Sequence, residues 1–299
     1  MVSAARVAGL GLSSKNENVW VLALIAVTVL WGWSYTVIHQ ALVELSASTF
    51  NAYRFIVGAI VMLPFVTKKL IHSTRLDWHV GSFAGLVLFL AFTFQTSGIA
   101  YTTASNAAFI TGLAVIFTPF LAKIFLKENP KRQQIIGAVL AAIGLAMLTI
   151  NNFSVHAGDT LILVCAVFTA LHIIVLAKVS KNHDVVLLAF IQVLVVALLS
   201  LLWALVSGQV TLPRIPQSYS TIVIMGIVGT AIAYFVQTKA QVQTAPNKIA
   251  LIIVLEPVFG GLFGYLLAGD RLTTVNMFGA LVIIIAMVIT ELKLRLIKT

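Results

Sequence analysis

Long apolar runs separated by short polar segments dominate the chain. Ten runs reach about 20 residues, the length that an α-helix needs to cross the hydrocarbon core of a bilayer. They occupy residues 19–40, 48–67, 79–98, 104–125, 132–151, 158–178, 184–206, 218–238, 246–268 and 274–292. Apolar stretches such as Leu281 to Ile285 do not alternate with polar residues, so the pattern predicts helices rather than the strands of a β-barrel.

Composition places the chain in the same class. Apolar residues make up 60% of the 299 residues and charged residues 9%, whereas soluble proteins average roughly 45–50% and 25%. The net charge of +10 does not predict a nucleic-acid partner, because the basic residues form short clusters between apolar runs. The single Cys165 excludes an intramolecular disulfide. The sequence therefore predicts an all-α integral membrane protein whose surroundings are a lipid bilayer.

The basic residues predict the orientation of the chain. If the segment 1–18 is cytoplasmic, sixteen of the 19 Lys and Arg residues lie on the cytoplasmic side. Only Arg214 and Arg271 lie on the opposite side, and Arg54 lies within the second run. This bias is typical of cytoplasmic loops. We expect a multi-pass protein of the cell (inner or plasma) membrane, with both the N-terminal segment and the tail 293–299 in the cytoplasm. The first run is too long for the apolar region of a cleaved signal peptide and reads as an uncleaved anchor.

The two halves of the chain share landmarks in the same order. Each half has a Thr-Ala-x-Asn motif, then a proline, an acidic residue and a Gly-Ala pair. They are Thr103–Asn106, Pro119, Glu128 and Gly137–Ala138 in the first half, and Thr244–Asn247, Pro257, Asp270 and Gly279–Ala280 in the second. We therefore expect two five-helix repeats, 19–151 and 158–292. Because five is odd, the second repeat is expected to be inverted in the membrane, a construction found in many secondary transporters.

Local motifs give this duplication a family resemblance. Leu30-Trp31-Gly32, Tyr53-Arg54-Phe55, Leu255-Glu256-Pro257-Val258 and Gly269-Asp270-Arg271-Leu272-Thr273 resemble the EamA-type domains of the drug/metabolite transporter superfamily. The resemblance covers roughly 19–292 and implies ten helices in two repeats. It also implies export or exchange of small metabolites, commonly amino acids. Asp270 stands where Glu is usual in the second repeat, and the charge is retained.

Two charged residues lie inside predicted spans, where an ionised group costs about 2.5–3.5 kcal/mol to insert. Glu256 lies near the middle of the ninth span and Arg54 about two turns into the second. Glu256 is a candidate for proton coupling or for binding a cationic group, and Arg54 is a further candidate for the substrate pathway or for coupling. Both residues are also compatible with structural roles: a hydrogen bond, an ion pair with each other, or, for Arg54, a side chain that extends to the interface.

Prolines and asparagines within the spans are further candidates. Pro119 and Pro257 are candidate helix breaks that free a backbone carbonyl one turn earlier, and packing kinks are the alternative. Asn106 and Asn247 begin the paired fourth and ninth spans. They are candidates for binding substrate from equivalent positions, or for capping their helices.

Aromatic and polar residues complete the candidate pathway. Trp31 is a candidate for an aromatic wall, since ligand sites combine apolar walls with a few polar groups. Trp33 and Tyr35 fit an interfacial belt instead. The weaker candidates, for which packing or interhelical hydrogen bonds are alternatives, are Phe109, Tyr234, Gln95, His172 and Gln237.

These features predict a secondary transporter that works by alternating access at a midplane cavity between the repeats. Small-molecule substrates and protons are the expected partners, and neither a cofactor nor a metal site is expected. The sequence has no P-loop and no catalytic motif such as His-Glu-x-x-His, so the chain is not expected to be an enzyme. An uncoupled facilitator, a drug exporter and a lipid-type flippase remain alternatives. A membrane enzyme or a receptor is a more distant one.

Overall fold

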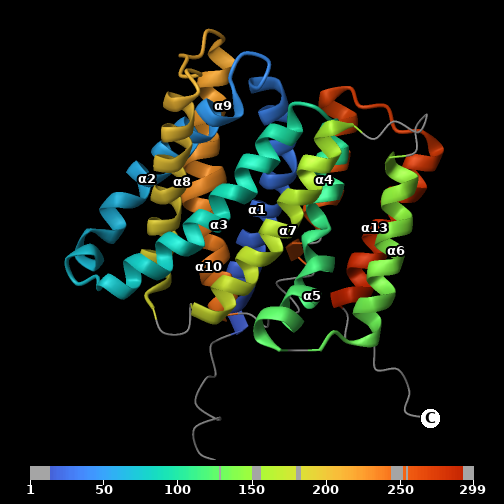
Figure 1. The fold of residues 1–299 in the computed structure, drawn as a ribbon, viewed down its shortest axis with the longest axis horizontal. Helices are drawn as coiled ribbons and strands as arrows, with labels where there is room; N and C mark the ends of the chain where they lie inside the picture. Colours follow the sequence, from blue (N-terminus) through green and yellow to red (C-terminus); the bar gives the residue numbers. More distant parts are fainter. Residues whose placement is uncertain are drawn as a thin grey trace, which may run out of the picture.

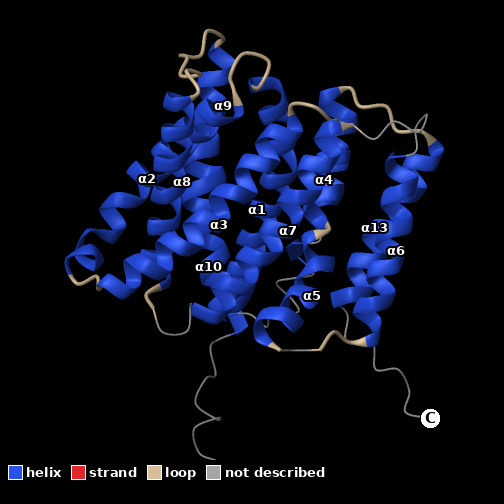
Figure 2. Ribbon diagram, viewed as in Figure 1, coloured by secondary structure: helices blue, strands red, loops and turns tan. Residues whose placement is uncertain are grey.

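The computed structural model describes residues 14–127, 129–149, 156–179, 183–243, 252–253 and 255–291. The described residues form helices and short connections, without a strand among them (Figure 2). The first half contains α1 (Ser14–Ala41), α2 (Ala47–Ile71), α3 (Arg75–Ile99), α4 (Ala104–Gly112), α5 (Ala114–Leu126) and α6 (Arg132–Thr149). The second half contains α7 (Ala157–Val179), α8 (Val185–Val206), α9 (Pro216–Gly226), η3 (Ile227–Ile232), α10 (Ala233–Gln243), α12 (Leu255–Phe263), η4 (Gly264–Ala268) and α13 (Thr274–Glu291).

Three of the predicted spans are not simple helices, and in the ninth α12 continues into the π-helix η4. The fourth span is divided at Leu113 into α4 and α5, whereas Pro119, the predicted break, lies inside α5. The eighth span continues from α9 through the π-helix η3 into α10. A π-helix widens the helix locally and is frequent at functional sites.

Side-chain caps mark where several helices begin. Ser46 caps α2 and Asp184 caps α8, because each side chain accepts a hydrogen bond from an otherwise unpaired N–H of the first turn. Thr74 forms a capping box with Asp77 at the start of α3. Thr103, rather than Asn106, caps α4.

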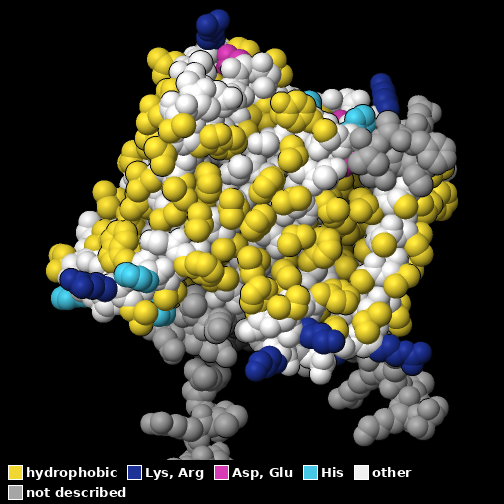
Figure 3. Space-filling model, in the orientation of Figure 1, with side chains coloured by type: hydrophobic (Ala, Val, Ile, Leu, Met, Phe, Trp, Pro, Cys, Tyr) yellow, Lys and Arg dark blue, Asp and Glu magenta, His cyan; other side chains and the backbone are white. Residues whose placement is uncertain are grey.

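The helices have the length and surface of a multi-pass membrane protein. Six of the described helical segments are long and apolar enough to cross a membrane, and Arg132–Met147, Leu255–Ala268 and Thr274–Ile289 are shorter apolar helices. The 25-residue α2 carries Arg54 inside it and is not one of the six. Large apolar side chains such as Phe65 are exposed, and in Figure 3 they cover the middle of the visible face, while Lys and Arg gather at its ends. This distribution suits lipid around the middle and water at both ends.

Helices from the two halves pack against each other throughout the molecule. α6 packs on α13, α2 on α8 and α3 on α7 (Figure 1). α12 packs on both α1 and α4. The largest buried apolar cluster includes Tyr35, Phe50, Phe109, Ile283 and Met287. The core is therefore shared between the halves, so that residues far apart in sequence meet near its centre.

Glycines allow α12 to approach α4 closely. A Cβ added at Gly260 would lie 2.2 Å from the Cβ of Ala108, a distance that real Cβ atoms do not show. We expect Gly260→Val to force these helices apart and to cost about 1–3 kcal/mol or more, as overpacking does. Thermal unfolding of the purified protein should therefore show a lower Tm. Leu262→Val, at a 48% exposed position of the same helix, is the control, and an unchanged Tm for Gly260→Val would contradict the proposed close packing.

Candidate functional site

A hydrogen-bonded chain of three side chains joins the two halves near the core. Glu256, in the first turn of α12, is only partly buried. Its Oε1 accepts a hydrogen bond from the Tyr35 hydroxyl of α1 at 2.9 Å. Gln95 of α3 donates from Nε2 to the same hydroxyl at 3.3 Å. The structure thus brings together Glu256 and Gln95, two of the predicted residues, through Tyr35.

The Glu256 carboxylate can accept a further hydrogen bond beyond those that the described residues donate to it. Among the described residues, Tyr35 is the only hydrogen-bond partner of this carboxylate, so Oε2 is left to accept another donor. The charge of Glu256 acts electrostatically on Tyr234 and on the buried Cys165. A partly accessible acid between apolar helices is suited to take up a proton or to bind a cationic group.

Arg54 is held by the protein and not by Glu256. Its Nε donates to Thr230 Oγ1 at 3.0 Å and its Nη2 to the Gly229 carbonyl at 3.4 Å. The guanidinium carbon lies 5.2 and 5.1 Å from the ring centres of Phe55 and Phe92. No ion pair of Arg54 occurs within the described part of the chain, whose two ion pairs lie elsewhere. The ion pair with Glu256 that the sequence left open is therefore not formed.

Arg54 does not extend to the membrane interface either, because it is only 2% exposed. Its charge is stabilised by a hydroxyl, a backbone carbonyl and two aromatic faces. Thr230 in turn donates to the Met225 carbonyl at 2.9 Å. Arg54 thereby fixes α2 and α3 to the π-helix η3.

Trp31 contacts the same backbone carbonyl. Its Nε1 donates to Gly229 O at 3.1 Å, so this carbonyl of η3 accepts from both Trp31 and Arg54. The rings of Trp31 and Tyr234 meet edge to face, with centres 6.3 Å apart. A π-helix shifts the backbone hydrogen-bonding pattern, which offers a reason why two side chains converge on this carbonyl. Trp31 and Tyr234 thus belong to one aromatic pair beside η3.

His172 forms a contact apart from Glu256, and Gln237 is not among the described partners of Glu256. His172 Nε2 and Gln192 Oε1 of α8 are 2.6 Å apart, and both residues are buried. This contact agrees with the interhelical hydrogen bond that was one of the alternatives for His172. Gln237 is a partly buried residue of α10. Neither residue belongs to the hydrogen-bonded chain around Glu256.

The remaining predicted residues lie along α4, α5 and α12. Phe109 is buried with its ring against Gly261, and Pro257 packs against Gly112. Asn106 is 9% exposed, and its backbone N–H donates to Thr103. Pro119 is buried within α5. Asn247 lies outside the described residues.

Two residues of these networks were not predicted as site residues from the sequence. Tyr35 had been assigned to an interfacial belt, yet it is 2% exposed and bonded to Glu256. It lies one helical turn after Trp31, and this spacing places both on one face of α1. Gln192 gave no such signal, since only the fold brings its side chain to His172.

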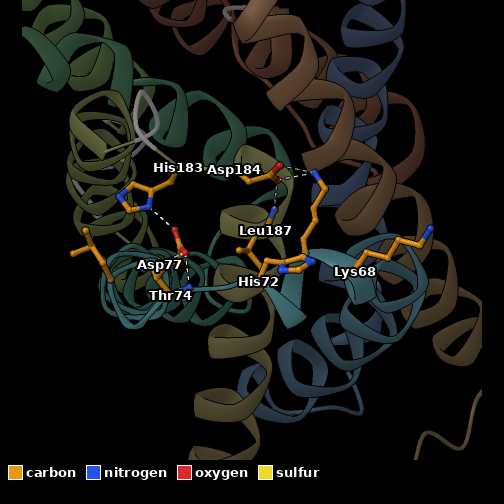
Figure 4. A pocket seen from close by; sticks show the side chains of 9 residues that line it. Lys68, His72, Thr74, Asp77, His183, Asp184 and Leu187 are labelled. Atoms are coloured by element: carbon orange, nitrogen blue, oxygen red, sulfur yellow. Dashed lines mark hydrogen bonds and ion pairs between the residues drawn. The ribbon is translucent and has the colours of Figure 1, made fainter.

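A cavity lies at the end of the molecule where α2, α3 and α8 meet (Figure 4). Its volume is about 620 Å³, and its lining residues are Lys68, Lys69, His72, Thr74, Leu76, Asp77, His183, Asp184 and Leu187. Both of its carboxylates have basic partners: Lys69 lies 2.6 Å from Asp184, and His183 lies 2.5 Å from Asp77. The cavity contains none of the predicted pathway residues.

The pairing in this cavity affects the pKa of Asp184. Partial burial would raise the pKa of this carboxyl, but the hydrogen bond from Lys69 and the backbone N–H groups of Leu187 and Val186 hold its pKa below the usual value. Asp184 thus serves as a helix cap and a contact between the halves. The described residues include no group of three His, Cys, Asp or Glu side chains that could hold a metal ion.

Apolar helices with polar groups between them define the class of this chain as a multi-pass membrane protein. The sequence model of the EamA-like transporter family matches residues 18–150 and, a second time, residues 156–292. The chain therefore belongs to the EamA-like transporter family, within the drug/metabolite transporter superfamily that its motifs resemble. This membership supports transport as its function, and the family's members are named as transporters, not as enzymes.

Relatives along the whole chain agree with this family. An "Uncharacterized transporter" of Archaeoglobus fulgidus is 31% identical over 91% of this chain and 85% of its own length. The "Uncharacterized transporter YyaM" of Bacillus subtilis is 24% identical over 95% and 97%. The "WAT1-related protein At3g02690, chloroplastic" of Arabidopsis thaliana is 22% identical over 92% and 70%. One solved structure, titled "Crystal structure of protein", shares the fold with a TM-score of 0.66 at 14% identity, covering 93% of this chain and 96% of its own.

Proposed function

We propose that the protein is a secondary transporter that moves small metabolites, such as amino acids, by alternating access at a site between two inverted repeats. The observation that carries this proposal is the Glu256 carboxylate, which lies between the halves with one oxygen bonded to Tyr35 and the other unused by the described residues. An embedded, accessible acid is a hallmark of ion-coupled and cation-binding membrane sites. Export or exchange is the direction that the family resemblance favours.

The packing of the helices supports the inverted repeats, 19–151 and 158–292. In such repeats, α1, α2 and α3 correspond to α7, α8 and α9–α10. Likewise, α4–α5 corresponds to α12–η4 and α6 to α13. With this correspondence, contacts between the halves occur in matched pairs. The contact of α3 with α7 has its counterpart in the contact of α10 with α1. In the same way, α3 with α8 corresponds to α9 with α2, and α12 with α1 corresponds to α5 with α7. The pairs α2 with α8 and α6 with α13 are their own counterparts. Such pairing is what a two-fold relation between the repeats would produce.

The roles of the other candidates follow from their contacts. Tyr35 and Gln95 position the Glu256 carboxylate, and the pair of Trp31 and Tyr234 supplies an aromatic wall next to it. Glu256 alternates between binding a proton and binding the cargo. Arg54 stabilises η3 through its hydrogen bonds to Thr230 and to the Gly229 carbonyl. In this arrangement both termini are cytoplasmic and the protein resides in the cell membrane, as the positive-inside bias predicts.

Flux measurements in proteoliposomes test this function. We expect vesicles that contain the purified protein to accumulate radiolabelled amino acids when a pH gradient is imposed, and vesicles without protein not to do so. Uptake that ignores the gradient would contradict proton coupling and favour a facilitator or exchanger. Absence of flux for every amino acid would contradict the proposed cargo. Parallel assays with a labelled lipid would then test the flippase alternative.

A further inference from the structure

Two carboxylates of the second half hold the start of α4 in the first half. The hydroxyl of Thr102, in the connection before α4, donates to Asp159 in the first turn of α7. The backbone N–H of Ser105 donates to Asp270 Oδ2 at 2.8 Å. We call these four residues the acid clamp. It joins the α3–α4 connection and the first turn of α4 to α7 and to the connection between η4 and α13.

Three residues of the acid clamp are buried, Asp270 is partly buried, and the surroundings are closely packed. Asp159 is 4% exposed and Ser105 is inaccessible. A Cβ added at Gly264 would lie 2.2 Å from Ser105 Oγ and 2.6 Å from Asp270 Oδ2. These contacts of Gly264, together with the close contact of Gly260 with Ala108, pack α12 and η4 tightly against the first half of α4. Nothing as large as a metabolite fits through such a contact.

The backbone conformation of Gly269 directs the Asp270 side chain toward α4. Gly269, which ends η4, has a φ of +75°, a conformation that favours glycine. The chain turns back there, so that Asp270 N donates to the Gly264 carbonyl at 3.1 Å. The Asp270 carboxylate then meets an unpaired N–H at the positive end of α4, where a negative charge is stabilised. This contact is therefore a charge-assisted hydrogen bond between the two halves.

The sequence does not repeat this bond in the other half. Ser105 belongs to the motif Thr103–Asn106, and Thr244–Asn247 carries Pro246 at the equivalent position. A proline nitrogen has no hydrogen to donate, so Pro246, which lies outside the described residues, cannot donate the equivalent hydrogen bond. In an inverted repeat, equivalent positions lie toward opposite faces of the membrane. The bond from Ser105 to Asp270 is thus available at one face only.

We propose that the acid clamp holds the pathway shut at its own face, so that the resting transporter is biased toward opening at the opposite face. With the orientation expected from the basic residues, the closed face is the non-cytoplasmic one and the resting state is inward-facing. This inference rests on the proposed transport function. It goes beyond that function by assigning the closed state to particular residues.

Cysteine labelling tests the clamp without any cargo. The reporter is Ser105→Cys, which keeps the backbone N–H, placed in a Cys165→Ala background because Cys165 is the only native cysteine. A membrane-impermeant maleimide is added to sealed vesicles of either orientation. We expect slow labelling of the reporter from the clamp face. Adding Asp270→Ala should raise that rate about tenfold, the population shift expected when one charge-assisted hydrogen bond is lost.

Matched variants make the result specific. Asp270→Glu retains a carboxylate and should restore slow labelling, whereas Arg271→Gln removes an exposed neighbouring charge and should change nothing. Size-exclusion chromatography, and full labelling after denaturation in SDS, verify the folded state. If Asp270→Ala does not fold, Asp159→Ala provides the same comparison from the other carboxylate. Fast labelling of Ser105→Cys with both carboxylates intact would overturn the clamp. An unchanged labelling rate after Asp270→Ala or Asp159→Ala, in a folded protein, would overturn it as well. Because no substrate is used, this failure is distinct from a failure of the transport proposal.

Discussion

Replacing Glu256 by glutamine is expected to reduce gradient-driven amino-acid uptake to the level of protein-free vesicles. Glutamine has nearly the same shape and keeps an oxygen that can accept the Tyr35 hydrogen bond. It carries no charge and does not bind and release a proton near neutral pH. The substitution therefore removes the proposed chemistry while leaving the packing of α12 in place. Uptake in proteoliposomes with an imposed pH gradient measures the effect, and thermal unfolding verifies that the variant is folded.

Glu44→Gln is the matched control for this experiment. Glu44 lies in the connection between α1 and α2 and accepts hydrogen bonds from the backbone N–H groups of Arg214 and Ile215. A hydrogen bond from Ser218, together with those backbone groups, keeps the pKa of Glu44 below its usual value, so this carboxylate stays ionised at neutral pH and has no coupling role. We expect most of the uptake to survive in the control. Wild-type accumulation by a folded Glu256→Gln protein would exclude Glu256 as the coupling group.

The helices were predictable from sequence because a bilayer imposes a simple rule. A segment in lipid has to satisfy its own backbone hydrogen bonds and reach about 20 residues, and apolar runs report both conditions. The interruption at Leu113 and the π-helix η3 were not predictable in this way. They depend on packing: Gly112 lies against Pro257 and Met287, and Thr230 of η3 is held by Arg54.

The candidate site was predictable in its chemistry and less so in its pairing. Charge inside an apolar run singles out Glu256 and Arg54, because such residues are costly unless they have a role. Their partners lie more than 170 residues away in the sequence. Hydropathy contains no information about such distances, so an ion pair between the two charges was a reasonable alternative. The structure instead gives each charge its own polar partners, Tyr35 for Glu256 and Thr230 for Arg54.

Arg54→Ala is expected to destabilise the protein strongly, by about 3 kcal/mol. The estimate follows from the loss of hydrogen bonds made by a charged group, worth about 1.5–3 kcal/mol each, and of the contacts with two aromatic rings. The loss also leaves the Gly229 carbonyl with Trp31 as its remaining side-chain donor in the described chain. Thermal unfolding in detergent, followed by tryptophan fluorescence, should show a clearly lower Tm. Lys68→Ala, at an exposed position of the same helix, should leave the Tm nearly unchanged.

A double-mutant cycle separates this structural role from a role in binding cargo. Thr230→Val removes the hydroxyl that accepts from Arg54 Nε while nearly preserving the shape of the side chain. If Arg54 acts through η3, the two substitutions together should destabilise the protein by less than the sum of their separate effects, with a coupling of about 1–2 kcal/mol. Additive effects would contradict this support of η3. A folded Arg54→Ala protein with wild-type Tm and no transport would place the guanidinium in the pathway, because only contact with the cargo would then explain the loss.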